Sequence, residues 1–507
     1  MSTVRDLEPS RARPRSGARG DGAVPSTPRR PIGALMGTGT AIVAAAAAVW
    51  WAPRGAVTTG QAVTLLLGGL AVGAILGVTL RSRLAYLVGP VALVIAYEIR
   101  WLGVDGPMTD LPRFDTLLAL FPLVFGRGWL GVLVLLPMLL GVALARRWRR
   151  SRTHAAGAPV RRRDLAVPAL GVGLVVLLLV GLVWPASTPP IVDDRGRPLD
   201  GSIAELGTVE LGGHEQALLI RGHDVGNPVV LYLEGGPGGT GLGAMRLYAG
   251  ELERDLVVVG WDQRGTGKSY PALEPKDTLT LERSVDDLLE LTDHLRERFD
   301  EERIFLLGNS WGTTLAVLAA QQHPERYHAI IGTGQMVSQR GTDQLMYEQM
   351  LTDARTAGDT DRVEELVALG PPPFADIADY APLLVRPSDR PEVEWPANVL
   401  VSEYTLLEKI NSGPALIETF ATLYPRLQDI DFRRDVPELQ VPLYVVDGDD
   451  EDPARADLAQ EWLAELDAPL IRHHVIADSA HRPHLQQPEE FARVMRDILD
   501  ETAAQGS

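Results

Sequence analysis

Residues 304–323 read Ile-Phe-Leu-Leu-Gly-Asn-Ser-Trp-Gly-Thr-Thr-Leu-Ala-Val-Leu-Ala-Ala-Gln-Gln-His, and this stretch decides the fold. An apolar run ends in Gly-x-Ser-x-Gly at 308–312 and passes directly into a helical pattern. A strand, a tight turn and a helix in that order lift a serine hydroxyl above the end of a sheet, where it can act as a nucleophile. The helix N-terminus behind Ser310 favours negative charge that develops on a bound acyl group. Ser310 is therefore the candidate nucleophile.

Outward from this stretch, short apolar runs alternate with helical patterns from about residue 205 onward. Continuous apolar strands separated by helices predict an α/β fold, with a mostly parallel sheet that is covered by helices on both faces. Residues 339–438 interrupt the alternation with helix-rich, acidic sequence, which indicates a helical cap inserted between two strands. The predicted strands are Gln216–Arg221, Pro228–Glu234, Leu256–Trp261, Arg303–Gly308, Ala329–Gly334, Pro442–Val446 and Ile471–Ile476. The predicted helices include Ser284–Phe299, Thr313–His323, Ala454–Leu466 and Pro488–Asp500.

Charge divides the 507 residues into two physically different parts near residue 185. Residues 1–184 hold 21 Lys/Arg and 8 Asp/Glu, whereas residues 185–507 hold 27 and 58, so the first part is basic and the second strongly acidic. A chain of this length exceeds one ordinary domain. The chain has no cysteine, which excludes disulfides and thiolate metal sites.

The first part reads as a membrane region. We expect a disordered basic tail over 1–30, because it is rich in Arg, Pro, Ser and Gly. A transmembrane region of about five helices is expected over 31–184, with the lipid bilayer as its partner, since most of its apolar runs approach the roughly 20 residues that a spanning helix needs. The apolar spans are 32–52, 61–80, 84–104, 129–145 and 165–184, and the apolar segment 116–125 either lengthens the fourth span or lies in the interface.

Arginine bias sets the expected orientation of these spans. The tail and the loops after the second and fourth spans carry most of the Arg residues, and five spans place all three on one side. The N-terminus is therefore predicted to be cytoplasmic, with residues 185–507 extracellular and the whole chain a multi-pass protein of the cell membrane. Five tryptophans lie at the predicted outer ends, as an aromatic belt would have them: Trp50, Trp51, Trp101, Trp129 and Trp184.

A nucleophilic serine needs a base, an acid that orients the base, and donors for the oxyanion. A histidine after the last strand is expected as the base, and His481 is our choice, with His484 second and His473 and His474 inside the preceding strand. The acid is expected after the strand 442–446, where 447–453 reads Asp-Gly-Asp-Asp-Glu-Asp-Pro. The nucleophile, the acid and the base would then follow one another along the chain as serine, acid and histidine, an order known for such sites. Because several acidic residues lie side by side in 447–453, the choice of acid stays open.

The oxyanion donors are expected in the glycine-rich segment 231–239, which reads Leu-Tyr-Leu-Glu-Gly-Gly-Pro-Gly-Gly. Backbone N–H groups of Gly235 and Gly236 there, with that of Trp311 just after the nucleophile, are the candidates. We predict no cofactor and no metal. The acidic run at 447–453 does not have the residue pattern of a calcium-binding loop. The glycines at 236–241 and 265–267 do not match the sequence patterns of dinucleotide-binding and phosphate-binding loops.

Together these segments resemble the proline iminopeptidase branch of the α/β hydrolases, over roughly 205–507. The markers are Gly-Gly-Pro-Gly-Gly at 235–239, Asp-Gln-Arg-Gly-Thr-Gly-Lys-Ser at 262–269, Gly-Asn-Ser-Trp-Gly at 308–312 and the late His481. The resemblance implies an α/β-hydrolase domain over 185–507, with a cap between the sixth and seventh strands. It also implies removal of an N-terminal residue, often proline, without a cofactor. We interpret Asp262 and Arg264 as structural.

The chain departs from the family at two positions. Glu234 stands where the family usually has a histidine, and there it either shapes the oxyanion loop or helps to hold a substrate amine. The family's acid usually follows a glycine by three residues, which from Gly448 gives Glu451, with Asp450 and Asp452 as alternatives. In the family, acidic cap residues bind the substrate's α-amino group, and the candidates here are Glu348, Glu364, Glu365, Glu403, Glu408 and Glu418.

Three functions follow from this interpretation. The first is a membrane-anchored serine hydrolase that acts as an aminopeptidase on short peptides and releases proline or small apolar residues. The second is an esterase, lactonase or amidase of a small molecule with the same catalytic residues, and the third a non-catalytic membrane sensor. No nucleic-acid partner is expected, and the oligomeric state is left open.

Overall fold

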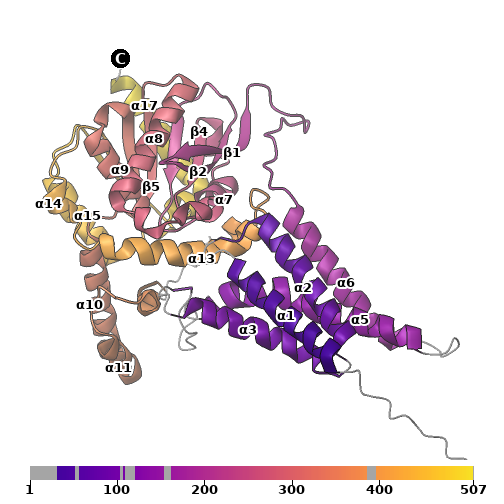
Figure 1. Ribbon diagram of the computed structural model, residues 1–507. Helices are drawn as coiled ribbons and strands as arrows, with labels where there is room; N and C mark the ends of the chain where they lie inside the picture. Colours follow the sequence, from indigo (N-terminus) through magenta and orange to yellow (C-terminus); the bar gives the residue numbers. More distant parts are fainter. Residues whose placement is uncertain are drawn as a thin grey trace, which may run out of the picture.

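A computed structural model describes residues 31–51, 56–80, 82–102, 107–108, 120, 122–153, 162–384 and 396–505. It has two parts, a bundle of long helices formed by residues up to Val183 and an α/β body formed by the rest of the chain (Figure 1). The predicted tail 1–30 and most of the arginine-rich stretch 154–163 lie outside the described residues.

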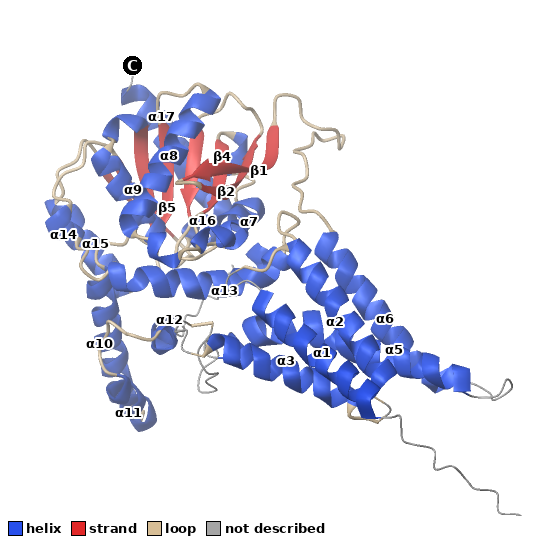
Figure 2. Ribbon diagram, in the orientation of Figure 1, coloured by secondary structure: helices blue, strands red, loops and turns tan. Residues whose placement is uncertain are grey.

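One eight-stranded sheet forms the centre of the α/β body (Figure 2). Its strand order is β1-β2-β4-β3-β5-β6-β7-β8; β1 pairs antiparallel with β2 and β2 antiparallel with β4, while all other neighbours are parallel. The predicted α/β fold with a mostly parallel sheet is therefore confirmed. The strands are β1 (Ile203–Leu211), β2 (His214–Gly222), β3 (Val229–Leu233), β4 (Val257–Asp262), β5 (Ile304–Asn309), β6 (Tyr327–Thr333), β7 (Leu443–Gly448) and β8 (Ile471–Ile476).

The central strands are apolar on both sides because two separate cores pack against them. Leu231 of β3 and Leu306 of β5 face one core, whereas Val230 and Phe305 face the other. The first core is closed by α8 (Leu281–Phe299), α9 (Trp311–Gln322) and α15 (Pro453–Glu465), and the second by α7 (Gly241–Tyr248) and α17 (Pro488–Gln505). Burial on both faces explains why these strands read as continuous apolar runs.

Helical segments fill the chain between β6 and β7, where the resemblance placed a cap. They are α10 (Gln339–Ala357), α11 (Thr360–Leu369), η7 (Ile377–Tyr380), α12 (Ala381–Leu384), η8 (Ala397–Val399), α13 (Leu406–Leu423), η9 (Tyr424–Arg426) and α14 (Phe432–Asp435). The short segments elsewhere are η3 (Leu252–Arg254), η4 (Gly267–Leu273), η5 (Lys276–Thr278), η6 (Pro324–Arg326) and α16 (Pro483–Gln486). Helix α13 runs beneath the sheet toward the N-terminal bundle (Figure 1).

The N-terminal bundle consists of long apolar helices. They are α1 (Pro31–Trp51), α2 (Thr59–Thr79), α3 (Ala85–Trp101), the π-helical turns η1 (Pro122–Gly128) and η2 (Gly131–Leu135), α5 (Leu136–Thr153) and α6 (Arg162–Val183). Among the described residues, three segments are long and apolar enough to cross a membrane: 59–79, 123–152 and 166–183. The five-span topology and its orientation stay predictions.

Helix α13 joins the bundle to the α/β body. Leu407 belongs to the same apolar cluster as the bundle helices, and a Cβ added at Gly181 of α6 would lie 2.9 Å from Cδ2 of Leu406. The backbone N–H of Ser187 also donates to the carbonyl of Ser402, at 3.0 Å. The two parts of the chain thus share apolar packing as well as a covalent connection.

Candidate active site

Ser310 occupies the sharp turn between β5 and α9. Its backbone has φ 50° and ψ −118°, in the region that L-residues rarely adopt. Its N–H donates to the carbonyl of Thr333 on β6 at 2.9 Å, and its carbonyl accepts from the N–H of Thr313 at 2.8 Å. These bonds hold the strained conformation, which is typical of a nucleophile placed at a sheet edge.

The two glycines of the turn are required by close packing. A Cβ at Gly312 would overlap the carbonyl of Leu233 on β3, and a Cβ at Gly308 would lie 2.8 Å from the Gly312 carbonyl carbon. Helix α9 can therefore approach the sheet at this point only because both positions lack a side chain.

His481 and Glu451 meet at the same edge of the sheet. His481 Nδ1 lies 2.9 Å from Glu451 Oε2, and the Glu451 side chain is 3% exposed. The two alternative acids are placed elsewhere: Asp452 caps α15 through the Ala454 N–H, and Asp450 is exposed at the surface. Of the three acids that the sequence left in competition, Glu451 is thus the one that the fold brings to His481.

Arg455 forms a second ion pair with Glu451. Its Nη1 donates to Glu451 Oε1 at 3.0 Å and also lies 3.0 Å from His481 Nδ1. Burial alone would raise the pKa of Glu451, but the positive charges and hydrogen bonds of His481 and Arg455 outweigh it and lower that pKa to about 2. Glu451 is therefore ionised at neutral pH, and it favours the tautomer in which His481 Nδ1 carries the proton and Nε2 is free to act as a base.

Ser310 and His481 are held near each other through the backbone. Asn309, the residue before the serine, donates from Nδ2 to the His481 carbonyl at 3.1 Å. The His481 ring lies against Gly334, directly after Thr333 of β6, where a Cβ would overlap it. Within the described residues, no hydrogen bond joins the Ser310 hydroxyl to the His481 ring. Such bonds are often long without substrate and tighten when it binds.

The oxyanion loop folds back toward Ser310. A Cβ at Gly235 would lie 3.2 Å from the Ser310 Cβ, so this loop borders the nucleophile. The Gly235 N–H, however, donates to Glu234 Oε1 at 2.8 Å, which engages one of the three predicted donors. The remaining candidate oxyanion donors are the backbone N–H groups of Gly236 and of Trp311, the first residue of α9.

Glu234 forms a buried ion pair that sequence reasoning missed. Its Oε1 accepts from Arg482 Nη1 at 3.1 Å, and its Oε2 from the Tyr232 hydroxyl at 3.1 Å. The carboxylate, 1% exposed, is thereby engaged inside the protein next to the oxyanion loop. Arg482 directly follows His481, so the two departures from the family pattern, Glu234 and Glu451, contact consecutive residues.

Two of the alternative histidines, His484 and His473, have other partners. His484 is buried, 2.9 Å from the Tyr232 hydroxyl through Nε2, and burial lowers its pKa well below the usual range, so it is neutral. His473 on β8 lies 3.1 Å from Asp447, and that hydrogen bond raises its pKa. Neither histidine contacts Glu451 in the described structure.

Most acidic cap residues already have cationic partners or lie on the surface. Glu403 pairs with Arg246 at 3.0 Å, Glu408 with Lys268 at 2.8 Å and Glu418 with Lys276 at 3.3 Å. The side chains of Glu348, Glu364 and Glu365 are exposed.

Asp343 of α10 is a buried cap acid that the sequence did not single out. It accepts from the hydroxyls of Tyr380 and Tyr424 and from the Gln339 amide, at 2.8–2.9 Å. Burial raises its pKa to about 6.

Asp262 and Arg264 are engaged within the fold, in accord with their structural interpretation. Asp262 accepts from the Lys268 N–H at 2.8 Å and from the Tyr404 hydroxyl at 3.0 Å, whereas Arg264 forms a buried pair with Asp287 at 2.7 Å. Gln263 between them receives the Trp311 indole N–H at 3.0 Å and donates to the Glu234 carbonyl at 3.0 Å. This segment therefore ties the oxyanion loop to the serine turn. Over the described ranges, no three His, Asp or Glu side chains gather as metal ligands would.

Comparison with known proteins shows what this chain is similar to. The chain is 28% identical over 310 residues to the probable aminopeptidase YbaC of Bacillus subtilis (59% of this chain, 97% of the relative) and 27% identical over 290 residues to the proline iminopeptidase of Heyndrickxia coagulans (54% and 91%). The crystal structure of the Mycobacterium smegmatis proline iminopeptidase is similar with a TM-score of 0.43 and 21% identity, over 60% of this chain and all of that one. Residues 236–494 match the alpha/beta hydrolase family, and the chain belongs to it.

Proposed function

We propose that this protein is a membrane-anchored serine hydrolase that removes N-terminal residues, proline or small apolar ones, from short peptides. One observation carries the proposal: a serine on a strained strand–helix turn lies at the same sheet edge as a histidine hydrogen-bonded to a buried carboxylate. The names of the relatives, a probable aminopeptidase and a proline iminopeptidase, favour the peptidase activity.

The proposed mechanism is acyl transfer in two steps. His481 Nε2 takes the proton of the Ser310 hydroxyl as its oxygen attacks the scissile carbonyl, and Glu451 stabilises the resulting imidazolium. The N–H groups of Gly236 and Trp311 stabilise the oxyanion. His481 then gives its proton to the leaving amine, and a water molecule attacks the acyl-enzyme by the same route to release the free residue and Ser310.

An aminopeptidase requires the free amine of its substrate, whereas an esterase does not. For the full chain in detergent, we expect hydrolysis of prolyl and alanyl anilides, with at least a hundredfold lower kcat/KM for the same anilides with acetylated amines. The measurement is anilide release, with short-chain esters assayed beside it. Equal rates on free and acetylated anilides, or hydrolysis of esters alone, would leave a serine hydrolase but exclude the aminopeptidase.

The anchor and its orientation are part of the proposal, and the absence of cysteine makes them simple to test. We expect a cysteine replacing the exposed Glu364 of α11 to react with a membrane-impermeant maleimide on intact cells. A cysteine replacing Ser151, at the end of α5, should react only after permeabilisation. The reverse pattern would place the hydrolase domain in the cytoplasm, and equal labelling of both before permeabilisation would contradict the predicted spans.

A further inference from the structure

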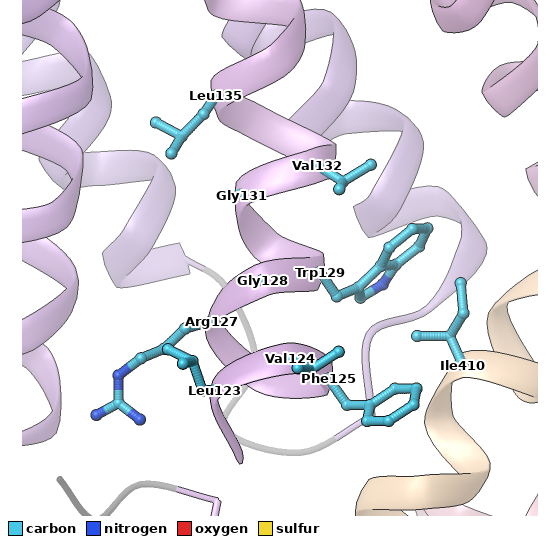
Figure 3. A pocket seen from close by; sticks show the side chains of 10 residues that line it. All are labelled: Leu123, Val124, Phe125, Arg127, Gly128, Trp129, Gly131, Val132, Leu135 and Ile410. Atoms are coloured by element: carbon cyan, nitrogen blue, oxygen red, sulfur yellow. The ribbon is translucent and has the colours of Figure 1, made fainter. Parts of the chain in front are cut away.

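An apolar pocket of about 650 Å³ lies where the helix bundle meets the cap. Figure 3 shows Phe125 and Trp129, from the bundle, extending toward Ile410 of α13. The pocket opens to the surroundings, since its lining residues Val124 and Val132 are 55% and 41% exposed. The lining residues are Leu123, Val124, Phe125, Arg127, Gly128, Trp129, Gly131, Val132, Leu135 and Ile410.

Two polar groups are placed in this apolar wall. The Trp129 indole Nε1 is shielded from solvent and has no hydrogen-bond partner among the described residues, a cost that a ligand's acceptor would remove once the ring turns toward the cavity. Arg127 is held by Glu98 at 3.0 Å, so its charge is compensated. Apolar walls with an unpartnered indole donor and a cation already paired with a carboxylate suit a hydrocarbon chain that ends in an uncharged acceptor, such as the ester carbonyl of a lipid.

The size and position of the pocket favour a lipid over a partner helix. A helix is about 10–12 Å across and rises about 1.5 Å per residue, so this volume would hold little more than one turn of it. It lies within the usual range for small-ligand pockets, about 300–1,000 Å³. Nine of its ten lining residues belong to the candidate membrane span 123–152, so the molecules around it in a bilayer are lipids.

The pocket is also close to the candidate active site. Ile410 and Leu416 both lie on α13, six residues apart, which corresponds to a rise of about 9 Å. A Cβ at Gly238 of the oxyanion loop would lie 2.7 Å from the Leu416 carbonyl oxygen. One helix therefore forms part of the pocket wall and also supports the loop that faces Ser310.

We propose that this pocket binds one acyl chain of a membrane lipid, with the lipid's ester carbonyl accepting the Trp129 indole N–H. The proposal rests on the membrane insertion proposed above. It adds a specific lipid site that touches the cap of the hydrolase domain.

The test is a titration that requires no turnover. The full chain in detergent micelles is mixed with phosphatidylcholine brominated on its acyl chain, and tryptophan fluorescence is recorded as the lipid fraction rises. A pocket gives quenching that saturates at a low lipid fraction, whereas general contact with lipid gives a gradual increase. We expect the saturable part to disappear in Trp129→Phe.

Filling the pocket should abolish the same signal. Gly131 lines the pocket, and its added Cβ would meet only Leu135 Cδ1, at 3.7 Å, so Gly131→Phe directs its ring into the cavity. The matched control is Gly173→Phe on α6, where a Cβ meets nothing within 4 Å. Ile410→Phe fills the pocket from α13, outside the bundle, in case Gly131→Phe does not fold.

We expect the lipid fraction at half-saturation to rise at least tenfold in Gly131→Phe and Ile410→Phe, and to stay within twofold in Gly173→Phe. An unchanged saturable signal in both filling variants, or its equal loss in the control, would overturn the proposal. Because fluorescence reports binding alone, an inactive protein that still shows the site would refute the hydrolase function and leave the lipid site in place.

Discussion

Ser310→Ala is expected to lower kcat on a cleavable anilide by about 10⁶-fold, the size of the effect when the nucleophile of a catalytic triad is removed. The hydroxyl is the attacking group in the proposed mechanism, and alanine has nothing to replace it. The fold should be unaffected, because alanine adds no volume and carries the same strained φ as serine. Anilide release and labelling by a fluorophosphonate, which modifies activated serines, are the measurements.

The matched control is Ser202→Ala, whose hydroxyl only donates to the Leu199 carbonyl at 2.6 Å. This variant should keep both activity and labelling. Retention of more than a tenth of the wild-type turnover by Ser310→Ala would remove Ser310 from the mechanism. Loss of activity in both variants would point to general instability instead.

Glu451→Gln is expected to lower kcat by about 10³–10⁴-fold, as loss of the orienting carboxylate does in serine hydrolases. An amide cannot stabilise the imidazolium of His481, and it can hold the ring in the wrong tautomer. Asp450→Asn is the matched control, because Asp450 is the exposed neighbour of Glu451. Activity lost in Asp450→Asn and kept in Glu451→Gln would show that the acid is misassigned.

The same substitution is expected to change how stability depends on pH. The pKa of Glu451 falls from an ordinary value of 4.5 to about 2 on folding, so its ionised form stabilises the fold fully above about pH 4.5. That contribution, on the order of 3 kcal/mol, is lost as the pH falls from 4.5 toward 2. Thermal unfolding should therefore separate wild type from Glu451→Gln widely at pH 7 and much less at pH 3. A constant difference would contradict the lowered pKa.

The central strands of the sheet were predicted well from the sequence, because burial on both faces requires a continuous run of apolar residues. Strand β3 (Val229–Leu233) is one residue shorter at each end than predicted, and the strand before Ser310 is shifted by one residue. Strand β1 (Ile203–Leu211) was missed. It lies at the sheet edge, pairs only with β2, and most of its residues stay partly exposed, so it has no continuous apolar run.

Residues of the candidate site could be predicted where a local sequence motif determines their position. Contacts between residues far apart in the sequence could not be predicted. The offset from Gly448 singled out Glu451, which the fold places beside His481. The pairing of Glu234 with Arg482 spans 248 residues, and no local pattern contains it. An acid inside a glycine-rich loop that is expected to be buried was nevertheless a usable signal, because such a charge requires a cation.

The π-helical turns of the bundle also escaped prediction. The sequence indicated a short fourth span at 129–145 and an apolar segment at 116–125. The structure has η1, η2 and α5 in succession from Pro122 to Thr153, so residues 122–125 extend this helical stretch, while 116–119 lie outside the described residues. Helical periodicity calculated for 3.6 residues per turn misses wider turns, which are often found at functional sites.

Because α13 packs against both parts of the chain, the helix bundle covers apolar side chains of the α/β body. Cleavage near residue 185 would remove the bundle residues that cover Leu406, Leu407 and Ile410. These apolar side chains of α13 would then be exposed to solvent. We therefore expect a hydrolase domain released by proteolysis to self-associate through these exposed apolar side chains.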